Sequence, residues 1–433
     1  MSSPHNNHLD ETSDSTSGRS AAIEACFFGL LLVFLVAYGS LLPTLQHLID
    51  EGTNIYAAKL IQQGLIPFRD FIYHQPPLYI YTLALLPTDH FVWGRALSLA
   101  ATCGAGRVIF EIAKSLMPEG APGALFPVAL FYFAALQYYG ILALPNACMV
   151  FFALLGAWWT IDRGRVVLGG AAIVVSVLFK PIAIPIIFAL ACALASRRDR
   201  WSDLLPFVAT VGSGAVLSYV ALHIGTDGAF TDLIYLQAVR YADSSVYELL
   251  KGLPMLRADL EPWTSREMNL LIHLDWLRSP DPLLALLLLP GVWVALRAGV
   301  VTRESLVLWI TWLTFSVLSV IYVWDVSWPH YHVLYLPPLS LLGGLFLHVV
   351  ARQSRMFAVV VVCLCITYAS AGLLVNHWRQ RDYTEVLALA RERAPLLTFD
   401  ATLNVLSRSE SPCGLLDYLA QRSPAFQGDR FAH

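Results

Sequence analysis

Charge is scarce in this sequence. Asp, Glu, Lys and Arg make up only 14% of the 433 residues, about half of their share in an average soluble domain. Hydrophobic residues fill 57% of the positions, and the mean hydropathy is +0.60. This balance excludes an ordinary soluble protein, because most of the chain carries side chains that prefer lipid to water. We therefore expect an integral membrane protein with many spans.

Cysteine and targeting signals are scarce as well. The seven cysteines form neither a disulfide framework nor a zinc-binding spacing, and only Cys413 lies outside the apolar segments. No basic region precedes the first apolar run and no small-residue cleavage site follows it, which predicts a retained span at residues 27–42. Residues 1–20 are rich in Ser, Asn, Asp and Thr, which predicts a disordered cytoplasmic amino terminus.

Apolar runs that suit membrane helices recur along the chain. They cover roughly residues 25–42, 77–87, 92–114, 122–140, 145–161, 166–179, 182–196, 204–224, 283–297, 304–323, 333–350 and 356–375. The clearest basic loops hold Arg163 and Arg165, Arg197 to Arg200, Arg297 and Arg303, and Arg352 and Arg355. Because basic loops stay in the cytoplasm, all of them should lie on one side of the membrane.

The run at 77–87 decides the topology. If it crosses the membrane, every basic loop falls outside, whereas a short re-entrant or surface helix there places every one inside. Its length of about 11 residues is too short to span comfortably. We therefore predict an all-α bundle of about 11 transmembrane helices within a membrane domain at residues 21–378. Residues 44–91 and 226–281 then form outward loops, and residues 379–433 form an outward carboxy-terminal tail.

The first outward loop holds much of the polar chemistry. Apolar residues from Ile55 to Ile61 follow helical spacing and Gly64 ends the turn, which predicts a short interfacial helix with Asp50 and Glu51 at its amino end. A carboxylate there can also simply cap the free N–H groups of the helix. Further polar residues in the same loop favour a chemical role. These are Arg69, Asp70 and His74, followed by the Pro76-Pro77 step.

An ordered set of residues in this loop resembles the first outward loop of the GT-C membrane glycosyltransferases. The resemblance is to the family 39 group, which includes protein O-mannosyltransferases and lipid A aminoarabinose transferases. The set is Asp50-Glu51, Tyr56, Gly64, Pro67 and Pro76-Pro77-Leu78. Looser similarities follow at Arg95, Phe151-Phe152, Lys180-Pro181 and His332 to Leu342. The resemblance covers roughly the first 200 residues well and the rest thinly, and it implies a GT-C-type helical bundle.

The resemblance implies an inverting transfer of a monosaccharide from a polyprenyl phosphate to a hydroxyl of an outward-facing acceptor. The phosphate leaves with its charge, so the reaction needs a base for the acceptor and cations for the phosphate. Asp50 matches the catalytic acidic residue of the family and is expected to be this base, with Glu51 as the alternative. The partners are then the sugar donor, a glycan, lipid or protein acceptor, and membrane lipids, without nucleic acid.

Other side chains are expected to bind the substrates. Lys180 lies between two short spans, where a lipid phosphate would lie, although a lysine there can also snorkel to the interface. Arg69 is a second phosphate candidate, or else one half of a surface ion pair. The predicted substrate-binding set also includes Tyr56, Asp70 and His74 in the first loop and His330 and His332 before a late span.

The turn before Phe151-Phe152 departs from the family pattern. Several GT-C enzymes carry a second acidic residue there, which some use for a divalent cation, whereas this sequence has Asn146. An amide can still coordinate a cation but supplies no charge, so a dependence on a divalent cation stays open. No metal ligand is predicted, and no cofactor is assigned with certainty.

Two other functions remain open. One is a transporter or flippase of lipid-linked substrates, and the other is an oligosaccharide ligase or polymerase. The sequence shows no fixed-period repeat, and its ionisable residues gather at one interface instead of the bilayer midplane, which weighs against a transporter. The expected location is the bacterial inner membrane, with the active site facing the periplasm.

Overall fold

The structure of the chain, a computed structural model, is helical throughout the part that it describes. The described residues are 10–43, 49–71, 73, 75–117, 122–137, 141–196, 201–232, 290–293, 297, 302–322, 329–354, 356, 359, 360, 363 and 367. Within these ranges no β-strand is present, which confirms the predicted all-α class for this part of the chain.

Nearly every apolar run within these ranges forms one helix or two consecutive helices. Such runs become helices because a backbone in lipid must satisfy its hydrogen bonds within its own segment. The helices are α1 (Asp10–Gly39), α2 (Ile49–Gln62), α3 (Leu78–Leu83), α4 (Phe91–Leu116), η1 (Pro122–Ala124), α5 (Leu125–Gln137), α6 (Asn146–Ala157), the π-helix η2 (Trp158–Asp162), α7 (Val166–Phe179), η3 (Pro181–Ala183), α8 (Ile184–Ala195), α9 (Trp201–Gly225), α15 (Arg303–Tyr322), η4 (Pro329–Leu334) and α16 (Leu336–Gln353). The runs at 283–297 and 356–375 lie largely outside the described residues.

Three of the described helices are long and apolar enough to cross a membrane, namely α1 over Ser20–Gly39, α4 and α9. Shorter apolar helical stretches cover Pro122–Ala135, Asn146–Asp162, Val166–Phe179 and Pro181–Ala195. Apolar side chains on α9 such as Leu205, Leu217 and Ile224 are exposed, as expected for a lipid-facing helix. The count of about 11 spans stays a prediction, because part of the chain lies outside the described residues.

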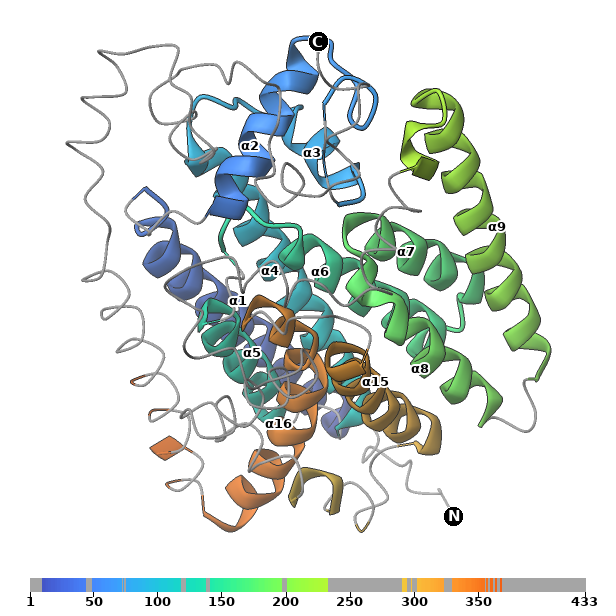
Figure 1. The fold of residues 1–433 in the computed structure, drawn as a ribbon. Helices are drawn as coiled ribbons and strands as arrows, with labels where there is room; N and C mark the ends of the chain where they lie inside the picture. Colours follow the sequence, from blue (N-terminus) through green and yellow to red (C-terminus); the bar gives the residue numbers. More distant parts are fainter. Residues whose placement is uncertain are drawn as a thin grey trace, which may run out of the picture.

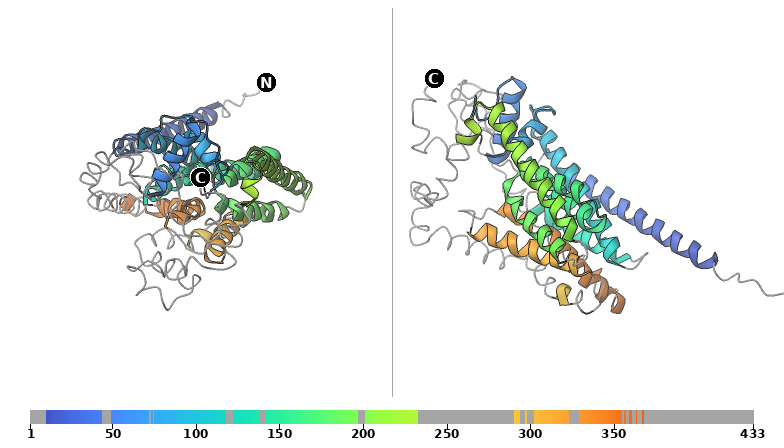
Figure 2. Two further views of the ribbon diagram at one scale, coloured as in Figure 1. Left: turned by 45° about the horizontal axis from the view of Figure 1, so that its top comes forward. Right: turned by 90° about the vertical axis from the view of Figure 1, so that its right-hand side faces the viewer.

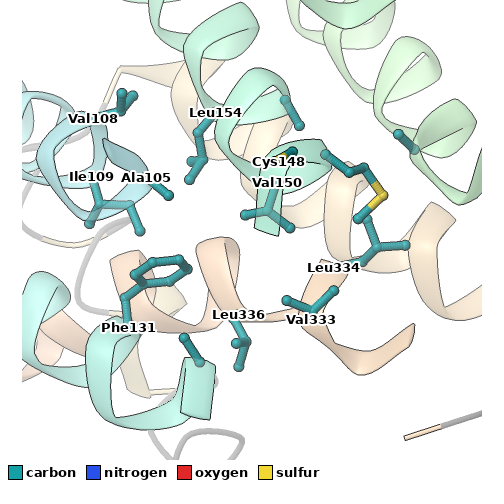
Figure 3. Close-up of a cluster of buried hydrophobic side chains, with 14 of the residues drawn as sticks. Ala105, Val108, Ile109, Phe131, Cys148, Val150, Leu154, Val333, Leu334 and Leu336 are labelled. Atoms are coloured by element: carbon teal, nitrogen blue, oxygen red, sulfur yellow. The ribbon is translucent and has the colours of Figure 1, made fainter. Parts of the chain in front are cut away.

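The interior of the bundle is apolar. Figure 3 shows how side chains from α4, α5, α6 and the η4–α16 region converge on one buried cluster. Its labelled members are Ala105, Val108, Ile109, Phe131, Cys148, Val150, Leu154, Val333, Leu334 and Leu336. This cluster joins early and late parts of the sequence into one body, which holds the polar residues described below.

Helices α1 and α4 run antiparallel. The rings of Phe27 and Phe110 stack with centroids 4.6 Å apart, while the Arg95 Nη1 near the start of α4 donates a 2.7 Å hydrogen bond to the Leu42 carbonyl just after α1. The segment between them therefore leaves and re-enters the bundle at one end, where α2 and α3 lie together (Figure 1). The six residues of α3 rise only about 9 Å, so the prediction of a helix too short to span is confirmed.

Charged side chains gather at the other end of α4. Arg107 Nη1 and Lys114 Nζ each lie 2.6 Å from a carboxylate oxygen of Glu24 on α1. Arg107 also pairs with Glu111, which lies one helical turn further along α4. Arg163, from one of the basic loops, lies 3.9 Å from Glu111. The basic loop and the segment that holds α2 are therefore at opposite ends of α4.

Helix α1 begins at Asp10, and its amino-terminal part projects beyond the bundle in the right-hand view of Figure 2. A helix that already exists in the span propagates more easily than it nucleates, which favours this extension. A disordered, cytoplasmic segment at residues 1–20 stays a prediction.

Candidate functional site

Helix α2 holds the acidic pair that the sequence singled out. It covers Ile49–Gln62 with Asp50 and Glu51 in its first turn, and Gly64, with φ of +89°, follows its end, as predicted. Residues 51–58 are all buried, and the position of this helix on the membrane surface stays a prediction. Protein covers α2 because its polar residues find partners within the bundle.

Glu51 is one of these buried polar residues and forms an ion pair with Arg95 of α4. The Arg95 Nε and Nη2 donate hydrogen bonds of 2.9 and 2.7 Å to the two oxygens of Glu51, and both side chains are 0% exposed. The backbone N–H of Ala143 donates a further 2.7 Å bond to Glu51. Because Arg95 also binds the Leu42 carbonyl, this one pair ties α1, α2, α4 and the turn before α6 together.

Asp50 is in a different position from Glu51. Its side chain is partly exposed, and no hydrogen bond or ion pair engages its carboxylate within the described part of the chain. Its charge acts electrostatically on both Tyr73 and Lys180. Of the two neighbouring carboxylates, Asp50 is therefore the one whose oxygens are available to a substrate.

Tyr73 and Asn54 lie beside Asp50. The Tyr73 hydroxyl donates a 2.7 Å hydrogen bond to the Asn54 Oδ1, and the Asn54 Nδ2 donates one of 3.1 Å to the Ala143 carbonyl. Burial raises the pKa of Tyr73, and the negative charge of Asp50 raises it further. Tyr73 therefore stays protonated and acts as a hydrogen-bond donor.

Lys180 directly follows the last residue of α7 and is buried, with 7% of its surface exposed. Its Nζ donates a 2.8 Å hydrogen bond to the Asn146 Oδ1 and lies 4.8 Å from the ring centroid of Tyr331. Burial lowers the pKa of Lys180 to about 8, and the charge of Asp50 opposes this shift. Unlike a snorkelling lysine, the side chain is enclosed by protein and makes no ion pair with a carboxylate of the described residues.

Arg69 and Asp70 form an exposed ion pair. The Arg69 Nε and Nη2 lie 2.9 and 3.0 Å from the two oxygens of Asp70, and Asp227 at the end of α9 lies 3.8 Å from the Arg69 Nη1. Asp70 also accepts a 2.7 Å bond from the Ile66 N–H, and the hydrogen bond from Arg69 lowers the pKa of Asp70. This is the surface ion pair that the sequence left open for Arg69, and a substrate role for either residue stays a prediction.

The remaining predicted residues are less informative. Tyr56 is buried within α2, and His332 is buried in η4, where its ring stacks on Tyr335 at a centroid distance of 5.4 Å. His74 and the side chain of His330 lie outside the described residues. The charge of Asp50 acts on Lys180. The roles of both residues, like those of Tyr56, His74, His330 and His332, stay predictions.

Three members of the site were not singled out from the sequence, namely Asn54, Tyr73 and Tyr331. Asn54 lies four residues after Asp50, the spacing that puts two side chains on one helix face, so its signal was present. Tyr73 and Tyr331 carried no comparable signal, because their contacts are made only in the folded chain.

No metal centre is evident in the part of the chain that the structure describes. Nowhere in it do three or more His, Cys, Asp or Glu side chains lie close enough to hold an ion. Asn146 accepts a hydrogen bond from Lys180.

Comparisons with known proteins address the fold. No family model and no curated protein matches the sequence. The oligosaccharyltransferase of Archaeoglobus fulgidus in complex with zinc and sulfate aligns with a TM-score of 0.50 and 15% identity, over 84% of this chain and 56% of that one. The same enzyme tethered to an acceptor peptide with the NVT sequon aligns with a TM-score of 0.53 and 12% identity, over 85% and 57%. ArnT from Cupriavidus metallidurans bound to undecaprenyl phosphate aligns with a TM-score of 0.48 and 17% identity, over 89% and 85%.

The chain spans a little over half the length of the archaeal oligosaccharyltransferase. At these identities the likeness concerns the architecture, and it confirms the predicted GT-C-type bundle. The protein therefore shares the helical fold of this oligosaccharyltransferase.

Proposed function

We propose that the chain is a glycosyltransferase that moves a monosaccharide from a polyprenyl phosphate to a hydroxyl group of an acceptor. The observation that carries the proposal is the buried, unneutralised ammonium group of Lys180, which the charge of the available Asp50 carboxylate influences. Buried charges are normally paired, so a buried cation without a carboxylate partner is suited to receive an anion from a ligand. A lipid phosphate supplies such an anion.

The proposed reaction is an inverting displacement. Asp50 removes the proton of the acceptor hydroxyl, and the acceptor oxygen forms a bond to the anomeric carbon of the sugar. The bond between that carbon and the phosphate oxygen breaks, and its electron pair stays on the phosphate. Lys180 stabilises this negative charge, while the protonated Tyr73 helps to hold Asn54 and the first turns of α2 in place.

The structure supports a division of roles within the acidic pair. Both oxygens of Glu51 bind Arg95, so deprotonating an acceptor would require breaking a buried ion pair. We therefore assign Asp50 as the base and Glu51 as a positioning residue. This assignment keeps Asp50 as the expected base and gives Glu51, the expected alternative, a positioning role.

Transfer assays with single variants test the assignment. The full chain in nanodiscs is incubated with a panel of radiolabelled monosaccharides on undecaprenyl phosphate and with glycan, lipid and peptide acceptors. Asp50→Asn should lower the transfer rate by at least about a hundredfold, because a general base contributes on this scale. Asp89→Asn, which changes an exposed carboxylate in the same segment, is the control and should leave the rate unchanged. Full activity of Asp50→Asn would contradict the role of Asp50 as base.

Binding of the lipid is measured separately from transfer. Undecaprenyl phosphate should raise the thermal unfolding temperature of wild type and Asp50→Asn, and Lys180→Met should abolish this rise. If transfer is seen only with oligosaccharides on undecaprenyl pyrophosphate, the chain is a ligase or polymerase instead. If no donor yields a product but labelled lipid crosses a sealed vesicle membrane, the transporter hypothesis gains support.

We also propose that the site faces the outside of a bacterial inner membrane. Single cysteines in a cysteine-free variant test this with a membrane-impermeant reagent applied to intact spheroplasts. Asp89→Cys should react and Arg165→Cys should not, because these exposed positions lie at opposite ends of α4. Reaction at position 165 alone would reverse the proposed orientation.

A further inference from the structure

The loop that follows α2 contains an unusual backbone conformation at Phe68. Its φ is +70°, a region that bulky residues rarely adopt, and its side chain is 6% exposed. Among the described residues, Asp227 is the other non-glycine residue with a positive φ, at +51°. Strained conformations persist only where the surrounding contacts hold them.

The loop that holds Phe68 contacts the end of α9, where Asp227 lies. The rings of Phe68 and Phe230 meet with centroids 5.2 Å apart, and the Arg69 Nη1 lies 3.8 Å from the Asp227 carboxylate. A hydrogen bond of 3.1 Å from the Phe230 N–H to the Thr226 hydroxyl holds this end of α9 in shape. The end of α9 therefore supports the ring of Phe68 on the side that faces away from the candidate site.

The inner side of Phe68 faces the candidate site. Its ring centroid lies 6.5 Å from that of Tyr73, the residue whose hydroxyl donates to Asn54. Asn54 in turn binds the Ala143 carbonyl, and Tyr73 lies within the electrostatic influence of Asp50. A continuous series of contacts thus leads from Phe230 through Phe68 and Tyr73 to the helix that carries Asp50.

We propose that Phe68 is a positioning residue, whose ring presses Tyr73 onto Asn54 and so fixes the orientation of the first turns of α2 during transfer. The proposal rests on the proposed role of Asp50 as base. The strained φ is then the cost of aiming the Phe68 ring inward between Phe230 and Tyr73. Loss of the ring should misplace the base without removing any group that binds the donor.

The substitution Phe68→Gly separates the ring from the backbone. Glycine adopts a φ of +70° without strain, so this variant keeps the loop conformation and removes only the side chain. We expect kcat to fall on the order of tenfold to a hundredfold with the KM for the donor nearly unchanged, because small displacements of a reacting group cost this much. Phe68→Tyr, which keeps the ring, should retain most of the activity. Leu65→Ala, an exposed position in the same loop, is the matched control and should behave as wild type.

A second readout reports the contact without catalysis. 3-Fluorotyrosine is placed at position 73, and its fluorine resonance is recorded in wild type, Phe68→Gly and Leu65→Ala. The resonance should move in Phe68→Gly only. If Phe68→Gly fails to fold, Phe230→Ala, which removes the outer support of the same ring, takes its place and should give the same two changes.

The outcomes separate this proposal from the proposed function. If Asp50→Asn is inactive but Phe68→Gly keeps its kcat, or loses only donor affinity, Phe68 is not a positioning residue. If the fluorine resonance of Phe68→Gly is the same as that of wild type, the proposed contact between Phe68 and Tyr73 is refuted. If Asp50→Asn keeps full transfer, the base assignment fails first and the role of Phe68 fails with it, whatever the resonance shows.

Discussion

Removing the guanidinium group of Arg95 should destabilise the fold strongly, because the carboxylate of Glu51 would then be buried without its partner. Arg95→Met keeps an unbranched apolar stem and deletes two hydrogen bonds to Glu51, of 2.9 and 2.7 Å, and one of 2.7 Å to the Leu42 carbonyl. Both members of the pair are 0% exposed, so no water replaces the guanidinium group. Breaking a buried ion pair from one side costs about 3–5 kcal/mol, and we expect a loss of this size here.

The free energy of unfolding is measured by denaturant titration in mixed micelles. Arg163→Met is the control, since Arg163 is half exposed and 3.9 Å from Glu111, and such a pair contributes about 0–1 kcal/mol. The double variant Arg95→Met/Glu51→Leu should recover part of the loss, because it no longer buries an unpaired carboxylate. A loss for Arg95→Met no larger than that of the control, or a double variant that is simply additive, would refute the reasoning.

Three further predictions follow from contacts in and around the site. Because Lys180 binds an anion only when protonated and burial lowers its pKa to about 8, the thermal stabilisation by undecaprenyl phosphate should weaken as pH rises through this value; Lys180→Arg should keep it at about pH 9, since arginine stays charged. Tyr73→Phe removes the hydrogen bond to Asn54 and should cost about 1 kcal/mol in the unfolding titration. Gly94→Ala should cost about 1–3 kcal/mol, because a Cβ there would lie 2.8 Å from the nearest side chain, whereas Gly212→Ala, with nothing within 4 Å, should be neutral.

Local sequence patterns located most helices closely. The apolar run at 92–114 became α4 at Phe91–Leu116, and the run at 166–179 became α7 with identical bounds. The first turn of α2 and the glycine after its end were also predictable, because capping and chain reversal depend on neighbouring residues.

Contacts between distant residues were harder to predict. Lys180 and Asn146 are 34 residues apart, and Glu51 and Arg95 are 44 apart, so no periodicity relates them. The acidic pair could therefore be found in the sequence, but the availability of Asp50 and the engagement of Glu51 depend on how α4 packs. The strain at Phe68 had no sequence signal, because it follows from the contact with the end of α9.

The ion pairs along α4 have a consequence for how the chain enters the membrane. The three basic side chains of α4 pair with carboxylates of Glu24, Glu51 and Glu111, and two of these three precede α4 in the chain. A charge that enters the membrane without a partner is costly. The neutralising partners are already synthesised when α4 emerges from the ribosome, so α4 is expected to insert together with α1 and α2 as one neutral hairpin.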